Sequence, residues 1–182
     1  MPKNTRKCKI CKEVFTKKQP LQMVCSPKCG YEYAKKQKEK AWKKEKKELK
    51  ESLKTWMDYY QEALKEFNKY IRCRDKDENC ISCDKRAGTY KLTSGHFYPQ
   101  GQYKSVALDE DNAHSQCWYD CNKNKHGNLQ EYRPRLIKKI GLERVEELDR
   151  KARETVKYSI PELIEIKERY KQKVKLLEDD LL

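Results

Sequence analysis

The sequence predicts a mainly helical α+β fold in which a long basic helix follows one small zinc unit and leads to a second. Eight of the nine cysteines fall into two quartets that share a C-x2-C and C-x3-C spacing. Only 36% of the 182 residues are hydrophobic and 40% are charged, so we expect no single large core, and bound metal would compensate for scarce burial. We therefore divide the chain into segments 1–30, 31–75, 76–128 and 129–182.

Segment 1–30 is expected to be the first zinc unit, because four thiolates suit one tetrahedral structural zinc ion. Short strands are expected at Val14-Phe15 and Val24-Cys25. Ser26-Pro27 is typical of a helix start, since serine caps free amides and proline needs no hydrogen bond there. The expected zinc ligands are Cys8, Cys11, Cys25 and Cys29.

Segment 31–75 is expected to form one long helix, because no proline and only Gly30 interrupts the chain from Lys28 to about Asp75. A continuous helix would extend about 70 Å at about 1.5 Å per residue. Its first half is almost entirely polar and should project into solvent. Its second half carries an amphipathic stripe at steps of three and four, which predicts docking. The stripe consists of Leu49, Leu53, Trp56, Tyr60, Ala63, Phe67 and Tyr70.

Most of the excess positive charge lies near the N-terminus. The chain has a net charge of +14, and residues 1–54, with 18 basic and 6 acidic residues, carry +12 of it. Such density attracts polyanions, and neutralised phosphates of nucleic acid release counterions. The alternative is a solvated Lys/Glu helix that aids solubility. The DNA-binding candidates on this helix are Lys35, Lys36, Lys43 and Lys44.

Segment 76–128 is expected to be the second zinc unit. A strand should run into Gly95-His96-Phe97, a loop should pass an acidic turn, a second strand should cover 112–116, and a short helix 119–125. Two knuckles separated by a hairpin, the second opening a helix, describe a treble-clef zinc fold, which coincides with one version of the ββα-metal (HNH-like) nuclease motif. The expected zinc ligands are Cys80, Cys83, Cys117 and Cys121.

Phosphodiester hydrolysis needs a base, a divalent ion at the departing oxygen and groups that hold both in line. His96 suits the base because imidazole titrates near neutral pH; otherwise it is a zinc ligand or a buried hydrogen-bonding residue. Asn112 could bridge the loop and orient His96, or be an ordinary turn residue. Asn122 could offer a carbonyl oxygen to Mg²⁺ or Mn²⁺.

Four further residues of this segment have open assignments. Lys123 and Lys125 could bind the flanking phosphate or be plain surface lysines. His114 or His126 could complete the catalytic metal site, although a surface position or a phosphate contact is the preferred reading for each.

Segment 129–182 is expected to be helical again. Gly141 separates a helix over 132–140 from one over 142–153, and Ser159 with Glu162 resembles a capping box. The apolar stripe of a last helix should pack against the long N-terminal helix. This stripe consists of Leu163, Ile166, Tyr170, Val174 and Leu177.

No apolar run approaches the ~18 residues that a membrane span requires, and no signal peptide is recognisable. We therefore expect a soluble cytoplasmic chain. In a reducing compartment the cysteines would hold metal rather than form disulfides. Cys73, between Arg72 and Arg74, belongs to neither quartet and is expected to be a free helical thiol.

At these residues the chain resembles the NinG family of lambdoid phages, also called Rap. The matching motifs are C-S-P-K-C-G, R-D-K-D-E-N-C-I-S-C, G-H-F, N-A-H-S-Q-C, C-N-K-N-K-H-G-N and Y-R-P-R-L-I. The resemblance implies a phage recombination protein that acts in the cytoplasm of the bacterial host cell. It also implies a structure-specific endonuclease that nicks branched DNA such as Holliday junctions and displacement loops. Its expected partners are branched DNA, a second copy of the chain, and phage or host recombination proteins.

Two departures from the expected pattern matter. HNH nucleases usually carry an aspartate metal ligand before the histidine, where this chain has Gly95, and the replacement is left open between Asp109, Asp111 and His114. Three residues separate Cys117 from Cys121, where the family commonly has two.

Two other functions compete with a structure-specific nuclease. The missing aspartate favours a non-enzymatic zinc module that binds branched or single-stranded DNA. An HNH nuclease that reads sequence is a third possibility, although no recognition module is apparent.

Overall fold

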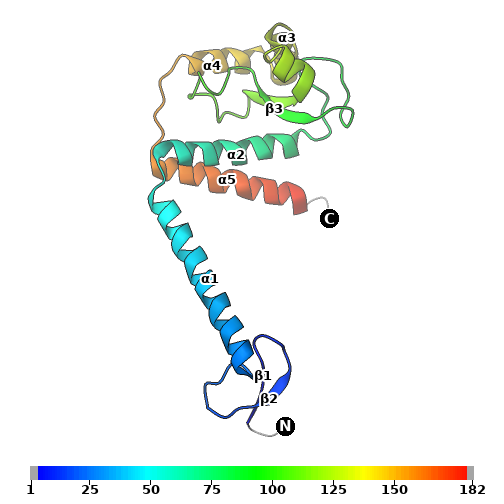
Figure 1. Ribbon diagram of the computed structural model, residues 1–182. Coiled ribbons are helices and arrows are strands. Elements are labelled where there is room, and N and C mark those ends of the chain that lie inside the picture. The colour runs from blue at the N-terminus through cyan, green and yellow to red at the C-terminus, as the bar shows by residue number, and fades with distance from the viewer. Residues whose placement is uncertain (1–3, 180–182) are drawn as a thin grey trace. The chain divides into compact units, whose positions relative to one another are not determined.

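The computed structural model describes residues 4–179. The chain divides into two compact units, Met1–Lys54 and Thr55–Leu182. Helices dominate both units, and the described strands form two-stranded antiparallel sheets, one in each unit. The predicted mainly helical α+β organisation is therefore confirmed (Figure 1).

In the N-terminal unit, β1 (Thr5–Lys7) pairs with β2 (Val14–Thr16), with Thr5 opposite Thr16. The predicted strand at Val14-Phe15 is present, whereas the one predicted at Val24-Cys25 is not. The segment before Cys25 is tied to the first knuckle by a bond from Lys9 N to Met23 O (3.0 Å) and forms no ladder.

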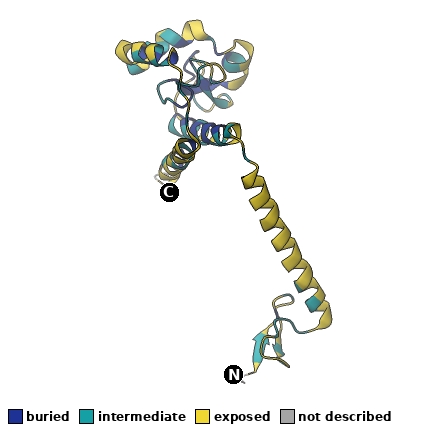
Figure 2. Ribbon diagram, turned by 90° about the vertical axis from the view of Figure 1, so that its left-hand side faces the viewer, coloured by how far each residue is buried: buried dark blue, intermediate teal, exposed yellow. Residues whose placement is uncertain are grey.

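Helix α1 (Pro27–Ser52) begins where the Ser-Pro pair predicts. Ser26 is the N-cap, and its Oγ accepts a hydrogen bond from Cys29 N (3.3 Å). No residue of α1 is buried, and Figure 2 shows its exposed colour along nearly its whole length.

The prediction of one continuous helix through residue 75 is wrong. α1 ends at Ser52 and α2 covers Trp56–Arg74. A capping box starts the second helix, because Thr55 Oγ1 accepts from Asp58 N (3.4 Å) while Asp58 Oδ2 accepts from Thr55 N (2.8 Å). This reciprocal capping satisfies two free amides and fixes a new helix start. The signal was present in the sequence as Thr-x-x-Asp.

In the C-terminal unit, α2 lies beside α5 (Ile160–Asp179), as Figure 1 shows. Apolar side chains of both helices form one core with the acidic loop and the start of β4. Helix α5 is preceded by the predicted capping box, in which Glu162 Oε2 accepts from Ser159 N (2.6 Å). The core is made by Tyr60, Ala63, Leu64, Phe67, Ile71, Ala107, Leu108, Ala113, Leu163 and Tyr170.

A second layer of this unit carries the hairpin of β3 (Leu92–His96) and β4 (Ala113–Cys117), antiparallel with His96 opposite Ala113. It continues into the π-helix η1 (Trp118–Asn124), α3 (Leu129–Ile140) and α4 (Leu142–Ala152). Helices α3 and α4 pack on the loop after β3 through a second core. That core is made by Ile81, Phe97, Val106, Tyr132, Leu136, Val145, Leu148 and Ala152.

Across residues 4–179, none of the helices combines the length and the apolar character that a membrane span requires.

Candidate active site and zinc centres

Both cysteine quartets have a geometry that fits zinc. Within each quartet the Sγ atoms lie within 4.8 Å of one another. Zinc–sulfur bonds of about 2.3 Å give a tetrahedron with edges of about 3.8 Å. The Sγ separations of 3.5 Å for Cys11 and Cys25 and 3.9 Å for Cys83 and Cys117 are close to that edge. Each quartet can therefore hold one zinc ion, and Cys73 belongs to neither.

The C-x3-C spacing of the second knuckle spans the start of the π-helix η1. The short helix predicted there is present and has the wider π geometry, which is found often at functional sites. Cys117 Sγ still accepts a hydrogen bond from Cys121 N (3.3 Å). The knuckle thus keeps both sulfurs in the quartet.

His96 ends β3 with its ring held on two sides. Its Nε2 lies 3.1 Å from Ala107 O, and the ring packs 5.9 Å from the Phe67 ring of α2. A carbonyl only accepts, so Nε2 carries the proton and a neutral ring keeps its lone pair on Nδ1. Burial lowers the pKa of His96 below its ordinary value, which favours the neutral imidazole.

Asn112 is fully buried and ties together the loop between β3 and β4. Its Oδ1 accepts from Tyr98 N (2.7 Å), and its Nδ2 donates to Tyr98 O (3.1 Å) and Val106 O (2.9 Å). Ala107, whose carbonyl holds His96, follows Val106 directly. Asn112 therefore braces the loop whose Ala107 carbonyl contacts His96, and it does not share a cleft with His96.

Gly95 leaves room for Gln116. A Cβ at position 95 would lie 2.6 Å from the Gln116 Cβ and still closer to its Oε1. The fully buried Gln116 donates from Nε2 to Gly127 O (2.7 Å) and to Ser82 Oγ. An aspartate therefore cannot occupy position 95 while Gln116 keeps this place.

Gln116 also orients Asn122. Its Oε1 accepts a hydrogen bond from Asn122 Nδ2 (3.0 Å). Since the Gln116 amide nitrogen is engaged elsewhere, Asn122 must present its NH2 group to Gln116 and its own carbonyl oxygen in another direction.

A cleft of about 320 Å³ brings His96 and Asn122 together. His126 and Ser94 also line it, and α2 contributes Asn68 and Arg72. No Asp or Glu is among the lining residues of this cleft.

Sequence reasoning missed the residues of α2 and β3 at this cleft. Asn68 Oδ1 and Ser94 Oγ are buried and lack a hydrogen-bond partner among the described residues. Within residues 4–179 no hydrogen bond or ion pair engages Arg72. Buried polar atoms are rarely left unpaired, so Asn68 Oδ1 and Ser94 Oγ retain unused hydrogen-bonding capacity beside this cleft. The available signal was the helical i, i+4 spacing of Asn68 and Arg72 beside the apolar stripe.

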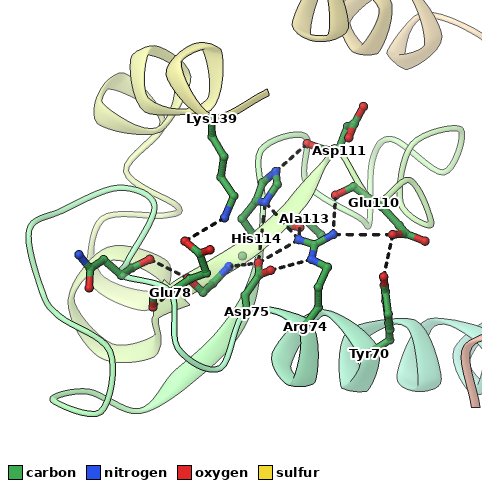
Figure 3. A network of polar contacts seen from close by, with 12 residues as sticks. Tyr70, Arg74, Asp75, Glu78, Glu110, Asp111, Ala113, His114 and Lys139 are labelled. Atoms are coloured by element: carbon green, nitrogen blue, oxygen red, sulfur yellow. Dashed lines mark hydrogen bonds and ion pairs between the residues drawn. The ribbon is translucent and has the colours of Figure 1, made fainter. Parts of the chain in front are cut away.

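His114 is in the protein core, which corrects the expectation of a surface or metal-site residue. It is 3% exposed, its Nε2 donates to Asp111 O (3.1 Å), and its Nδ1 accepts from Arg74 Nη2 (3.2 Å). Figure 3 shows this network, in which Asp75 also pairs with Arg74. Burial, and then the charge of Arg74, lower the pKa of His114 to about 3. His114 is thus a neutral structural group.

The other two proposed replacements for the missing aspartate also lie outside the cleft. Asp109 pairs with Lys151 (3.1 Å) and Asp111 with Arg144 (2.9 Å). Neither carboxylate is among the lining residues.

The predicted DNA-binding lysines are all exposed, and none lines the cleft. Lys123 Nζ lies over the Trp118 ring, 5.2 Å from its centroid. Lys125 follows η1 on the surface. The candidates in the N-terminal unit, on α1, are Lys35, Lys36, Lys43 and Lys44.

Comparison with known proteins gives one consistent result. The family described as "Bacteriophage Lambda NinG protein" matches residues 1–180. The chain is similar to the protein ninG of Escherichia phage 933W, with 34% identity covering 93% of this chain and 92% of that protein. The protein ninG of Salmonella phage P22 is 33% identical, and the match covers 96% of this chain and 94% of that protein. The protein ninG of Escherichia phage lambda is also 33% identical, and the match covers 93% of this chain and 92% of that protein. No solved structure matches.

We expect two zinc ions per chain, one for each quartet. Cys121→Ser removes one thiolate of the second quartet and should release one ion, because oxygen is a poorer zinc ligand in a thiolate site. Cys73→Ser is the matched control and should retain both ions. Native mass spectrometry would measure this, and full zinc retention by Cys121→Ser would contradict the assignment.

We expect His114 to make stability depend on pH. Its folded pKa of about 3 lies below the ordinary 6.5, so below pH 6.5 the unfolded state takes up a proton that the folded state does not. The free energy of unfolding should therefore fall by up to about 1.4 kcal/mol per pH unit as the pH drops.

The variant His114→Gln isolates this effect. Glutamine can donate to Asp111 O and accept from Arg74 without titrating. Urea unfolding in zinc-containing buffer at about pH 7 and about pH 5 should show a smaller pH dependence for the variant. Equal pH dependence of the two proteins would mean that His114 is not held neutral.

Proposed function

The chain belongs to the NinG family, and from this premise we propose that it is a metal-dependent endonuclease that hydrolyses phosphodiester bonds of branched DNA during phage recombination. Holliday junctions and displacement loops are the proposed substrates. The proposed fold of residues 76–128 is a treble clef of the ββα-metal (HNH-like) type. The proposed place of action is the cytoplasm of the bacterial host.

The observation that carries the proposal is the shared cleft of His96 and Asn122. His96 is neutral, anchored through Nε2 to Ala107 O, and keeps Nδ1 to take a proton from water. Asn112 maintains this orientation through the loop. The hairpin supplies the base, η1 supplies the amide oxygen, and the second cysteine quartet holds both elements.

The donors at the cleft fit a hard divalent ion. Asn122 Oδ1, and the unpaired Asn68 Oδ1 and Ser94 Oγ, are neutral oxygens of the kind that Mg²⁺ or Mn²⁺ accepts, and His126 adds an imidazole. When bound, the ion supplies charge stabilisation at the departing oxygen. Because no carboxylate lines the cleft, the DNA phosphate would supply the negative charge.

Arg72 is the proposed phosphate ligand of the site. It is a cation of α2 at the cleft, and no acidic partner engages it within the described chain. Guanidinium groups bind phosphate oxygens in a bidentate manner and remain charged at every relevant pH. Arg72 would hold the scissile phosphate against His96.

The basic helix α1 would contribute DNA affinity without reading bases. Its exposed lysines suit phosphate contacts, which position the protein and depend strongly on salt. A homodimer would provide the two cuts that resolve a two-fold junction. Phage or host recombination proteins are proposed further partners.

One observation favours a second candidate function. Gly95 excludes the aspartate ligand of typical HNH sites. A non-catalytic zinc protein that binds branched or single-stranded DNA would need no such ligand.

His96→Ala should abolish nicking of a synthetic four-way junction in Mg²⁺, with a loss of at least about 100-fold, because general-base catalysis contributes that much. Junction binding without Mg²⁺ and zinc content should stay unchanged, which separates loss of chemistry from loss of folding. Equal nicking by the variant would remove His96 from the mechanism.

Binding without nicking by the wild type would favour the non-catalytic alternative, and equal cleavage of a linear duplex would argue against structure specificity.

Arg72→Gln should lower the nicking rate about 100-fold, the typical effect of removing one charge-stabilising group at a reacting oxygen. Lys65→Gln, at an exposed site on the same helix, removes the same charge outside the cleft and should have little effect. Single-turnover nicking kinetics measure both. Equal effects of the two substitutions would mean that Arg72 acts only through general charge.

A further inference from the structure

Two exposed aromatic rings lie side by side at the start of η1. Trp118 and Tyr119 are 38% and 58% exposed, and their ring centroids are 6.3 Å apart. Lys91 Nζ lies 5.0 Å from the Trp118 centroid, and Lys123 Nζ lies 5.2 Å from Trp118 and 5.9 Å from Tyr119. We call these four residues the aromatic patch.

Neither core explains the aromatic patch. Trp118 and Tyr119 belong to none of the buried clusters in the described chain. Its lysines have no ion-pair partner among residues 4–179. Asp120, the acidic residue in the same turn, is paired with Lys85. The patch therefore presents to solvent two partly exposed aromatic rings with lysine ammonium groups over them, and its positive charge is not neutralised by an acidic residue of the described chain.

Such a surface matches the chemistry of unpaired nucleotides. Bases stack on aromatic side chains without regard to sequence, and flanking cations bind the phosphates. A base inside a duplex is already stacked on its neighbours and cannot offer both faces. The patch should therefore favour single-stranded segments over paired DNA.

The aromatic patch lies on the elements that form the cleft. Lys91 directly precedes β3, which ends in His96, and Lys123 directly follows Asn122 on η1. A strand held on the patch is thus held by the elements that carry the proposed chemistry.

We infer that the aromatic patch binds an unpaired base at a DNA branch point, which gives the proposed nuclease a preference for branched over continuous duplex DNA. This inference rests on the proposed function for its biological meaning. The predicted base stacking, however, can be measured without cleavage.

The test compares Trp118→Ala with wild type in zinc-loaded full-length protein without added Mg²⁺. Fluorescence anisotropy would give the affinity for a fork with two single-stranded arms and for a linear duplex of equal length. We expect about tenfold weaker fork binding and less than twofold change on the duplex. Trp118→Phe should restore fork binding, since it keeps a stacking face. Trp42→Ala, at the exposed tryptophan of α1, is the matched control and should show no selective loss.

An unchanged fork affinity, an equal loss on both DNAs, or a Phe variant as weak as the Ala variant would overturn the inference. If Trp118→Ala loses zinc, Tyr119→Ala decides by the same criteria, because its ring is more exposed. Nicking assays test the proposed nuclease activity and do not bear on the binding inference. Selective fork binding in a protein that never nicks would leave the patch standing and remove the nuclease.

Discussion

The cysteine quartet of residues 80–121 is the constraint on which the C-terminal unit depends. Two of its thiolates come from the segment before β3 and two from the end of β4 and from η1, and a single tetrahedral ion can join all four. A chain with 40% charged residues has little apolar surface to perform this task. The quartet joins the segment before β3 to the end of β4 and to η1, and these elements carry His96 and Asn122 to one cleft.

Buried polar groups take the place that apolar side chains hold in other small units. All five residues of β4 are buried, although its central residues are His114, Ser115 and Gln116. Each of these finds partners, as when Ser115 N donates to Asp75 Oδ2 (2.9 Å). Such networks are favourable only while every member is satisfied, and loss of one partner costs about 1–3 kcal/mol for the group left behind. This unit therefore tolerates little change along β4.

The sequence was sufficient to predict the parts of the fold that depend on local patterns. The cysteine spacing predicted both quartets, Ser26-Pro27 predicted the start of α1, and Ser159 with Glu162 predicted the start of α5. The break before α2 was not predicted, because the continuous helix was inferred from the absence of proline alone and the Thr55 to Asp58 capping pattern was not recognised. Helices end where a better cap is available, even without a breaker.

Residues that meet only in three dimensions could not be found in the same way. His96 and Asn122 were chosen for their neighbours in the chain, and the structure brings them to one cleft. Arg72 reaches it from a helix more than twenty positions away, and no local pattern predicts that contact. The surface position predicted for His114 is wrong, because burial, and not spacing, decides whether a histidine is a ligand or part of the core.

The contact between Gly95 and Gln116 also has an evolutionary consequence. A carboxylate at position 95 and a long amide at position 116 are sterically exclusive, while shortening the amide alone frees Asn122 from its anchor. Glycine at position 95 with glutamine at 116 is one arrangement, and a carboxylate at 95 with a shorter residue at 116 is the other. A chain that changes only one of the two positions has either a steric clash or an unanchored Asn122. Relatives that carry glycine at position 95 are therefore expected to carry glutamine at position 116, and the two positions should change together.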